Sequence, residues 1–493
     1  VTHRLRNPTH EMSLSKDVSV EVFAADFAWG ASTAAYQVEG AWDLDGRGPS
    51  IWDIFSHTKG RVFEDQNGDV ACNSYRLWDE DLRCIQHLGL THYRFSFSWS
   101  RLLPDGTTSY VNPKGVAYYN KVINDLTDKA ITPMVTLNHF DLPQALEHRG
   151  GWKSPEIVNV FDSYARFCFK TFGDRVKFWI TLNEPQIYAK LGYEDGLFAP
   201  GMKEKGSALY LVGHNMLRAH ARVWHSYHAH FRHLQRGKVS IALNSDWAMP
   251  SDPGCPEDVA AAQRYMDFSL GWFACPVFCT GDYPESMRSM IEARNLELDF
   301  VDGQRLPKFS EDEPTVLGTA DFFALNYYTS RKVKQASPRP GELSFAADQG
   351  AEGTTDPSWP ICGVSWLAVF PEGLRKLLSY IKETCNNPTI YITENGFAQR
   401  GPVELEDLDR CQFYRDTLQE VSKAIRDDGV NVKGYFAWSL LDNFEWTHGF
   451  SVRFGLFHVD FSRDERSRTV YRSGREYAAV VARHRGHTKF SKD

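Results

Sequence analysis

The sequence has 493 residues, of which 42% are hydrophobic and 14% aromatic, and its formal net charge is −8 at pH 7. A chain of this size can bury a large core, either as two or three domains or as one large α/β barrel. The modest acidic charge and the lack of a long basic run argue against a nucleic-acid partner. No apolar run reaches the length of a membrane span, so we expect no membrane insertion.

The nine cysteines are scattered along the chain and odd in number. Free thiols buried in a reducing compartment are the simplest interpretation of this pattern. Cys275 and Cys279 lie four positions apart, but no second cysteine pair or histidine cluster accompanies them. The sequence therefore predicts no metal site at this pair.

The first residues are polar and lack the hydrophobic region of a signal peptide. Every Asn-x-Ser/Thr triplet in the chain has proline in the middle position, which prevents glycosylation. We therefore expect a cytoplasmic protein. Residues 1–20 are expected to form a tail, and residues 21–493 a folded domain. Met12 is a candidate native start.

Strand-like and helix-like segments alternate along the chain. The strand-like runs are rich in β-branched, aromatic and small apolar residues, and they cover 27–32, 92–97, 132–137, 178–182, 238–243, 321–325, 390–394 and 432–438. The helix-like runs show apolar residues at helical spacing, and they cover 73–88, 116–130, 157–172, 208–234, 259–278, 284–295, 371–384, 407–428 and 471–485. Residues 331–365 are rich in Pro, Gly and Ser and predict a long loop.

This alternation predicts parallel strands. Eight strand–helix units without a linker or sustained repeat favour a single (β/α)8 TIM barrel. An open doubly wound sheet is the alternative, and it would usually carry a glycine-rich phosphate loop after its first strand. The Gly46-Arg47-Gly48 segment follows no predicted strand, so it does not meet that requirement.

Polar side chains stand where five of the predicted strands end: His139, Asn183 with Glu184, Asn244, Asn326 and Glu394. Solvation of a strand end could explain any one of them. A barrel, however, brings the carboxyl ends of all its strands to one rim, where active sites are built. We therefore expect these side chains to share one site.

Two glutamates on one rim suit displacement at an acetal carbon, with one as nucleophile or base and the other as acid. Retaining enzymes hold such a pair about 5–5.5 Å apart and inverting enzymes about 6.5–9.5 Å apart. Arg94 and the hydroxyl of Tyr328 are expected near Glu394 and would keep it ionised. Glu184 has no obvious cation beside it, so a raised pKa would let it act as an acid near neutral pH.

Four blocks together resemble glycoside hydrolase family 1, the β-glucosidase family, and they are residues 27–40, 181–185, 391–396 and 438–446. The resemblance covers roughly residues 21–485 in order. Residues 91–96 and 101–108 resemble the animal cytosolic branch of this family, with lactase-like members as the next most similar group.

The resemblance implies a role for each matching position. Glu394 would be the nucleophile and Glu184 the acid and then the base, while Asn183 would bond the sugar 2-hydroxyl. The other implied residues would contact the remaining sugar hydroxyls (Gln37, His139, Glu445, Trp446), form the stacking floor (Trp438, with Phe454 nearby), support the carboxylates (Arg94, Asn326, Tyr328) or line the aglycone entrance (Trp366). The implied substrate is a small β-glycoside, and no cofactor is needed.

Two positions narrow the activity that the resemblance implies. Thioglucosidases of the family carry Gln where this chain has Glu184, which disfavours myrosinase activity. Members that act on 6-phosphosugars lack a carboxylate where this chain has Glu445, and that carboxylate would repel a phosphate.

The predicted activity is that of a retaining β-glycosidase acting on β-D-glucosides and β-D-galactosides with hydrophobic aglycones. Alternatives are a transglycosidase of the same fold, a lactase-like β-galactosidase and a non-catalytic glycan-binding relative. The presence of both glutamates argues against the last. The sequence leaves the natural aglycone and the oligomeric state open.

Overall fold

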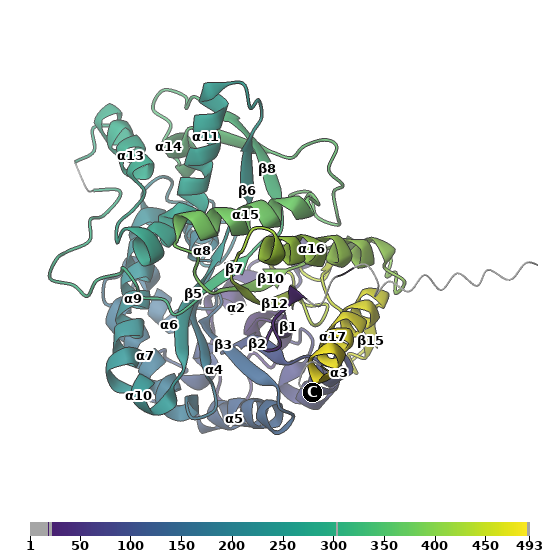
Figure 1. Cartoon of the computed structure of the whole chain (residues 1–493). Coiled ribbons are helices and arrows are strands. Elements are labelled where there is room, and N and C mark those ends of the chain that lie inside the picture. The colour runs from purple at the N-terminus through teal and green to yellow at the C-terminus, as the bar shows by residue number, and fades with distance from the viewer. Residues whose placement is uncertain (1–17, 19–21, 302–303, 491–493) are drawn as a thin grey trace, which may run out of the picture.

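The computed structural model describes residue 18, residues 22–301 and residues 304–490, with side chains as far as residue 486. Most of the expected tail therefore lies outside the described residues. A ring of strands stands at the centre and helices surround it (Figure 1). Among the described helices, none is both long enough and apolar enough to cross a membrane.

Eight parallel strands close into a barrel in the order β1-β12-β10-β7-β5-β4-β3-β2. They are β1 (Ala28–Ser32), β2 (His92–Ser96), β3 (Thr132–Asn138), β4 (Phe178–Asn183), β5 (Lys238–Asn244), β7 (Phe323–Asn326), β10 (Ile390–Asn395) and β12 (Val432–Trp438). The barrel confirms the predicted (β/α)8 fold, and each barrel strand begins within two residues of its predicted start.

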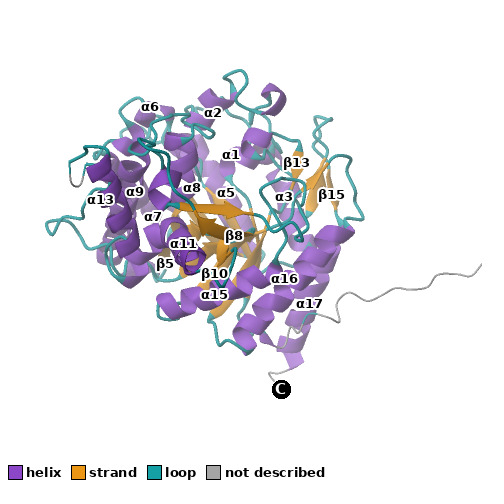
Figure 2. Ribbon diagram, turned by 90° about the horizontal axis from the view of Figure 1, so that it is seen from above, coloured by secondary structure: helices purple, strands orange, loops and turns teal. Residues whose placement is uncertain are grey.

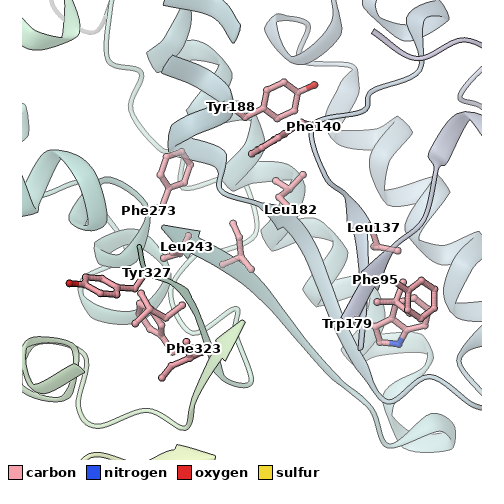
Figure 3. Packing of buried hydrophobic residues seen from close by; sticks show 14 of the residues in the cluster. Phe95, Leu137, Phe140, Trp179, Leu182, Tyr188, Leu243, Phe273, Phe323 and Tyr327 are labelled. Atoms are coloured by element: carbon pink, nitrogen blue, oxygen red, sulfur yellow. The ribbon is translucent and has the colours of Figure 1, made fainter. Parts of the chain in front are cut away.

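The barrel strands are buried on both faces, as parallel strands usually are. One cluster, which includes Ala28, Met134, Ile180 and Phe436, contains residues of seven barrel strands and fills the barrel. The residues that alternate with these point outward and pack against the surrounding helices. Figure 3 shows Trp179, Leu182, Leu243 and Phe323 among this outer set.

Helices wrap the barrel on its outside (Figure 2). The longer ones are α3 (Ser74–His87), α5 (Pro113–Asp128), α7 (Ile157–Phe172), α9 (Ala208–His230), α11 (Pro256–Met266), α13 (Glu285–Glu297), α15 (Pro371–Thr384), α16 (Leu408–Arg426) and α17 (Arg472–Phe490). Proline is the first residue of α5, α11 and α15, where its fixed φ suits a helix start and its missing N–H has no intrahelical partner to lose.

Shorter helices lie mainly in the loops between these elements: α1 (Ala35–Val38), α2 (Ile51–Ser56), α4 (Trp99–Leu102), α6 (Gln144–Glu147), α8 (Pro185–Ala189), α10 (Arg232–Gln235), α12 (Trp272–Ala274) and α14 (Phe345–Gln349). Two-residue and three-residue strands add small ladders, in which β11 (Gln399–Arg400) pairs with β13 (Val452–Arg453) and β14 (Phe457–Val459) pairs with β15 (Arg468–Val470).

The prediction of a continuous loop over residues 331–365 is wrong. The segment contains most of β8 (Ser330–Gln335), all of α14 and all of β9 (Ala351–Thr354), and β8 pairs with both β6 (Trp247–Pro250) and β9. Most of the six residues of β8 are polar. Only Ser330 and Val333 of this strand are buried. A strand beside solvent can form without the apolar run that marks a buried strand, so β8 could not be recognised from its hydrophobic pattern.

The helix predicted over residues 259–278 is also interrupted. The structure ends α11 at Met266 and continues through π-helical turns at Asp267–Gly271 and Cys275–Cys279, with α12 between them. A π-helical turn changes the spacing of apolar residues only slightly over a short segment. Periodicity alone therefore does not distinguish such turns from a regular α-helix.

Candidate active site

The two glutamates stand at the carboxyl ends of two barrel strands. Glu394 is the fifth residue of β10, and its strand register pairs it with Asn326 at the end of β7. Glu184 directly follows β4 in the left-handed conformation, with φ 43° and ψ 59°, and Pro185 then begins α8. A non-glycine residue in this conformation is strained, and such strain is concentrated at functional sites.

Arg94 fixes the position of Glu394. The Nη1 atom of Arg94 donates to Glu394 Oε1 at 2.6 Å, and the Tyr328 hydroxyl donates to Glu394 Oε2 at 2.9 Å. Both charged side chains of the pair are almost fully buried, with 1% and 5% exposed. Each oxygen of the nucleophile candidate thus has its own donor, as a buried carboxylate requires.

One hydrogen-bond network links the two glutamates through Asn183 and Asn326. Arg94 Nη2 donates to Asn183 Oδ1 at 2.7 Å, and Asn326 Nδ2 donates both to the same oxygen at 3.1 Å and to Glu184 Oε1 at 2.8 Å. Arg94 therefore contacts Glu394 directly and reaches Glu184 through two amides. Residues 210 positions apart, by the difference between 394 and 184, belong to one cluster.

Burial and electrostatic repulsion between Glu184 and Glu394 change the pKa values of the two carboxyl groups to different extents. Burial and then the negative charge of Glu394 raise the pKa of Glu184 to about 8. Burial also raises the pKa of Glu394, but the charge of Arg94 and hydrogen bonds from Arg94, Tyr328 and Asn326 oppose that rise. Glu184 is therefore the group that holds a proton near neutral pH, while Arg94 and the hydrogen-bond donors favour the ionised form of Glu394.

A third carboxyl group belongs to Glu445, which lies beside Gln37. Gln37 Nε2 donates to Glu445 Oε2 at 3.5 Å and to the Phe444 carbonyl at 2.9 Å. Burial, followed by the charge of Glu394, raises the pKa of Glu445 to about 8. The Gln37 Oε1 atom is buried and has no hydrogen-bond partner in the described protein, so it is free to accept from a ligand hydroxyl.

Aromatic rings surround this polar centre. The His139 ring lies nearly parallel to the rings of Trp438 and Trp446, at centroid distances of 5.9 and 6.0 Å. Asn183 Nδ2 lies 3.1 Å from His139 Nε2, and burial lowers the pKa of His139 well below its usual range, so Nε2 of a neutral ring accepts from the amide. Flat apolar faces beside hydrogen-bonding groups suit the two faces of a sugar ring.

Tyr328 connects the carboxylates to the outer part of the site. Its ring meets the buried Phe454 ring edge-on at 6.1 Å and the Trp366 ring edge-on at 5.9 Å. Trp366 is 41% exposed, which places it at the solvent side of this group. All thirteen candidate residues from the sequence analysis are therefore connected, directly or through one neighbour, to the two glutamates or to Glu445.

Several supporting residues escaped the sequence analysis. Thr393 donates to Asn326 Oδ1 at 2.6 Å, Thr136 accepts from Arg94 Nε at 3.2 Å, and Asn443 accepts from Gln37 Nε2 at 3.1 Å. Thr393 and Asn443 adjoin motif residues, and that adjacency is the only sequence signal for them. Nothing in the sequence marks Thr136, because a threonine within a strand is common.

Among the described side chains, no group of three or more His, Cys, Asp or Glu residues is arranged to hold a metal ion. The two carboxyl groups at the strand ends differ in their surroundings. Glu394 is paired with a buried guanidinium, and the raised pKa of Glu184 lets it keep a proton near neutral pH.

Comparison with known proteins gives an independent line of evidence. The chain is 54% identical over 461 residues to the cytosolic β-glucosidases of Cavia porcellus and Homo sapiens, a match that covers 93% of this chain and 98% of each relative. It is 50% identical to human lactase/phlorizin hydrolase over 93% of this chain and 24% of that protein. Among solved structures, aphid myrosinase matches with a TM-score of 0.89 and 41% identity, covering 93% of this chain and 99% of that one.

The family model for glycosyl hydrolase family 1 matches residues 19–486. This range contains both strand-end glutamates and every other candidate residue named above. The fold, the family match and the close relatives agree, and the chain belongs to glycosyl hydrolase family 1.

Proposed function

We propose that this protein is a retaining β-glycosidase that hydrolyses β-D-glucosides and β-D-galactosides with hydrophobic aglycones. The observation that carries the proposal is that two glutamates of one cluster have different electrostatic surroundings. Glu394 is ion-paired with Arg94, while burial raises the pKa of Glu184 to about 8. Double displacement requires such a division between an anionic nucleophile and a protonated acid.

In the first step, the Glu394 carboxylate attacks the anomeric carbon while Glu184 gives its proton to the glycosidic oxygen. The aglycone leaves as an alcohol, and the sugar remains bound to Glu394 as an ester. Arg94 and Tyr328 hold the two Glu394 oxygens, so the attacking group is already oriented. The oxygen of Asn183 accepts from Arg94 and Asn326, and one of its amide N–H groups donates to His139, so the other N–H remains for the sugar 2-hydroxyl.

In the second step, the Glu184 carboxylate removes a proton from water, and the resulting oxygen attacks the anomeric carbon. The ester bond to Glu394 breaks, and the sugar is released with its original configuration. Glu184 regains its proton and Glu394 regains its charge, so the cycle closes without a cofactor.

The remaining residues support recognition of a neutral sugar. Glu445 and Gln37 offer polar atoms for sugar hydroxyls, while Trp438, Trp446 and His139 offer ring faces. A 6-phosphate beside Glu445 is disfavoured, because it would place a second anion near Glu394, whose charge already raises the pKa of Glu445. The half-exposed Trp366 would contact the aglycone, which favours aryl or other hydrophobic leaving groups.

We also propose that residues 21–493 act as one catalytic domain in the cytoplasm. The relatives named cytosolic β-glucosidase and the nine free cysteines support this location. A transglycosidase would use the same first step and replace water by an alcohol in the second.

Proton NMR of the first sugar formed from an aryl β-glucoside tests the proposal. We expect the β-anomer to appear first and the α-anomer to follow by mutarotation, because two inversions give net retention. Initial release of the α-anomer would contradict the double displacement. Adding a short-chain alcohol measures the balance between hydrolysis and transfer, and a dominant glycoside product would favour the transglycosidase.

A further inference from the structure

Three cysteine side chains meet at a place that the proposed mechanism does not use. Cys275 and Cys279 bound the π-helical turn that follows α12, and Cys385 is the C-terminal cap of α15. The sulfur atoms of Cys279 and Cys385 lie 3.3 Å apart, although 106 positions separate them in the sequence. We call Cys275, Cys279 and Cys385 the thiol cluster.

The geometry of the thiol cluster suits covalent chemistry between sulfur atoms. A disulfide bond is about 2.0 Å long, so small side-chain movements would bring these two sulfurs to bonding distance. Cys275 and Cys279 are half-buried and Cys385 is 7% exposed, so a small oxidant can approach from the side of Cys279. By contrast, Cys72, Cys84, Cys168 and Cys411 are buried.

The cluster also favours the reactive form of one sulfur. Hydrogen bonds from the Cys275 and Cys385 thiols lower the pKa of Cys279, and the same interactions, together with burial, raise the pKa of each donor. A thiolate is the nucleophile in thiol oxidation and in disulfide formation, and neighbouring donors stabilise it. The arrangement therefore contains one attacking sulfur and a neutral thiol in contact with it.

We propose that Cys279 and Cys385 are an oxidisable pair that forms a reversible disulfide when the protein meets hydrogen peroxide. The Cys279 thiolate attacks the peroxide oxygen, which gives a sulfenic acid and releases hydroxide. The Cys385 thiol then attacks the Cys279 sulfur, the sulfur–oxygen bond breaks, and water leaves. The two thiols together lose two electrons to one peroxide, and a dithiol reductant returns both thiols.

The crosslink would join two connections that support the site. The turn containing Cys279 lies between β5 and β7, and Phe278 packs on Phe323 of β7 at a ring distance of 4.6 Å. Cys385 lies between α15 and β10, the strand that carries Glu394. A bond across such a long stretch of chain restricts the unfolded state, so we expect the oxidised protein to unfold at a higher temperature.

Peptide mapping of the Cys275→Ser variant tests the assignment. In this background, the tryptic peptide 265–288 contains Cys279 as its only cysteine and the peptide 383–400 contains Cys385 as its only cysteine. After treatment of the folded variant with a stoichiometric amount of hydrogen peroxide, we expect these two peptides to appear as one crosslinked species that dithiothreitol separates. Recovery of both peptides unlinked, or with Cys385 linked to another cysteine, would overturn the proposal.

Two single variants supply the controls in the wild-type background. Cys385→Ser removes one partner, so peroxide should no longer raise the thermal midpoint of unfolding. Cys255→Ser removes a half-buried thiol outside the cluster and should leave the peroxide-induced rise unchanged. Loss of the rise in Cys255→Ser, or its persistence in Cys385→Ser, would contradict the pairing. Neither variant touches the proposed catalytic residues, so hydrolytic activity before oxidation should be unaffected.

Discussion

The centre of the barrel and the peripheral sheet of β6, β8 and β9 hold their ion pairs in opposite ways. Arg94 and Glu394 are paired with 1% and 5% of their side chains exposed, while Lys334 of β8 and Glu352 of β9 pair with 53% and 54% exposed. Water can solvate either member of the outer pair when the other is lost. In the inner pair, loss of one member leaves a buried charge without its ion-pair partner.

A short distance between opposite charges therefore does not by itself measure the importance of an ion pair. The outer pair contributes little, because exposed pairs are typically worth about 0–1 kcal/mol. The inner pair fixes the protonation and orientation of a proposed catalytic group. We therefore expect substitutions to have effects graded by their distance from the inner pair.

The largest effect should follow removal of the proposed nucleophile. Glu394→Ala should lower the hydrolysis rate by about 10⁵-fold or more, as removal of a nucleophile does in other enzymes. Azide can occupy the vacated space, and we expect it to restore turnover and to yield a glycosyl azide of inverted configuration. Activity near that of the wild-type protein, without azide, would refute the role of Glu394.

Replacement of the proposed acid should have the next largest effect. Glu184→Gln should slow hydrolysis of alkyl glucosides by about 10²–10⁴-fold, and it should affect activated aryl glucosides less. The pKa of Glu184 is raised to about 8, so its proton is present below that pH and lost above it. The wild-type rate should therefore fall on the alkaline side, and this limb should flatten in Glu184→Gln with an activated aryl substrate.

Glu445→Gln is the matched control for that pH profile. Burial also raises the pKa of Glu445 to about 8, so its ionisation could produce a similar alkaline limb. If Glu184 is the acid, the limb persists in Glu445→Gln. A limb that is unchanged in Glu184→Gln but absent in Glu445→Gln would transfer the role to Glu445.

The inner and outer ion pairs can be compared directly by urea unfolding. Arg94→Met should lower the free energy of unfolding by about 3–5 kcal/mol, because it leaves the Glu394 carboxylate buried without its cation. Lys334→Met should change it by about 0–1 kcal/mol. Adding Glu394→Gln to Arg94→Met should recover part of the loss, since the unpaired charge is then removed. If Arg94→Met and Lys334→Met lowered the free energy of unfolding equally, the inner ion pair would be no more important for stability than the outer one.

The smallest effect is expected at the solvent side of the site. Trp366→Ala should raise KM for aryl glucosides by about tenfold and change kcat little, because the ring supplies aglycone contact rather than chemistry. Ile361→Ala, at a residue that is 49% exposed in the same segment, is the matched control. KM for methyl glucoside should not change, and an equal rise for that substrate would place Trp366 elsewhere in the binding process.

The barrel could be predicted from the sequence because its strands are buried on both faces. The run Ile390-Tyr391-Ile392 has no polar residue, and Asn395-Gly396 follows as a turn signal. The outer strand β8 presents Arg331, Lys332 and Lys334 around one buried valine, which resembles a solvated loop. Burial produces the pattern that sequence analysis detects, so the exposed strands were missed.

In the candidate site, too, some features could be predicted from the sequence and others could not. Glu184 and Glu394 could be paired from the sequence, because a barrel brings strand ends together. The route by which Arg94 reaches Glu184, through Asn183 and Asn326, depends on amide orientations that no spacing encodes. The same holds for the contact between Cys279 and Cys385, which only the packing of distant connections creates.

The most direct test of the proposed mechanism is to trap its intermediate with an activated 2-deoxy-2-fluoro β-glucoside. The fluorine slows both steps, and the good leaving group allows the first to proceed, so the glycosyl-enzyme should accumulate. We expect time-dependent inactivation and a single 2-fluoroglucosyl adduct on Glu394, located by mass spectrometry in peptide 383–400. An adduct on another residue, or steady turnover with no adduct, would contradict the account.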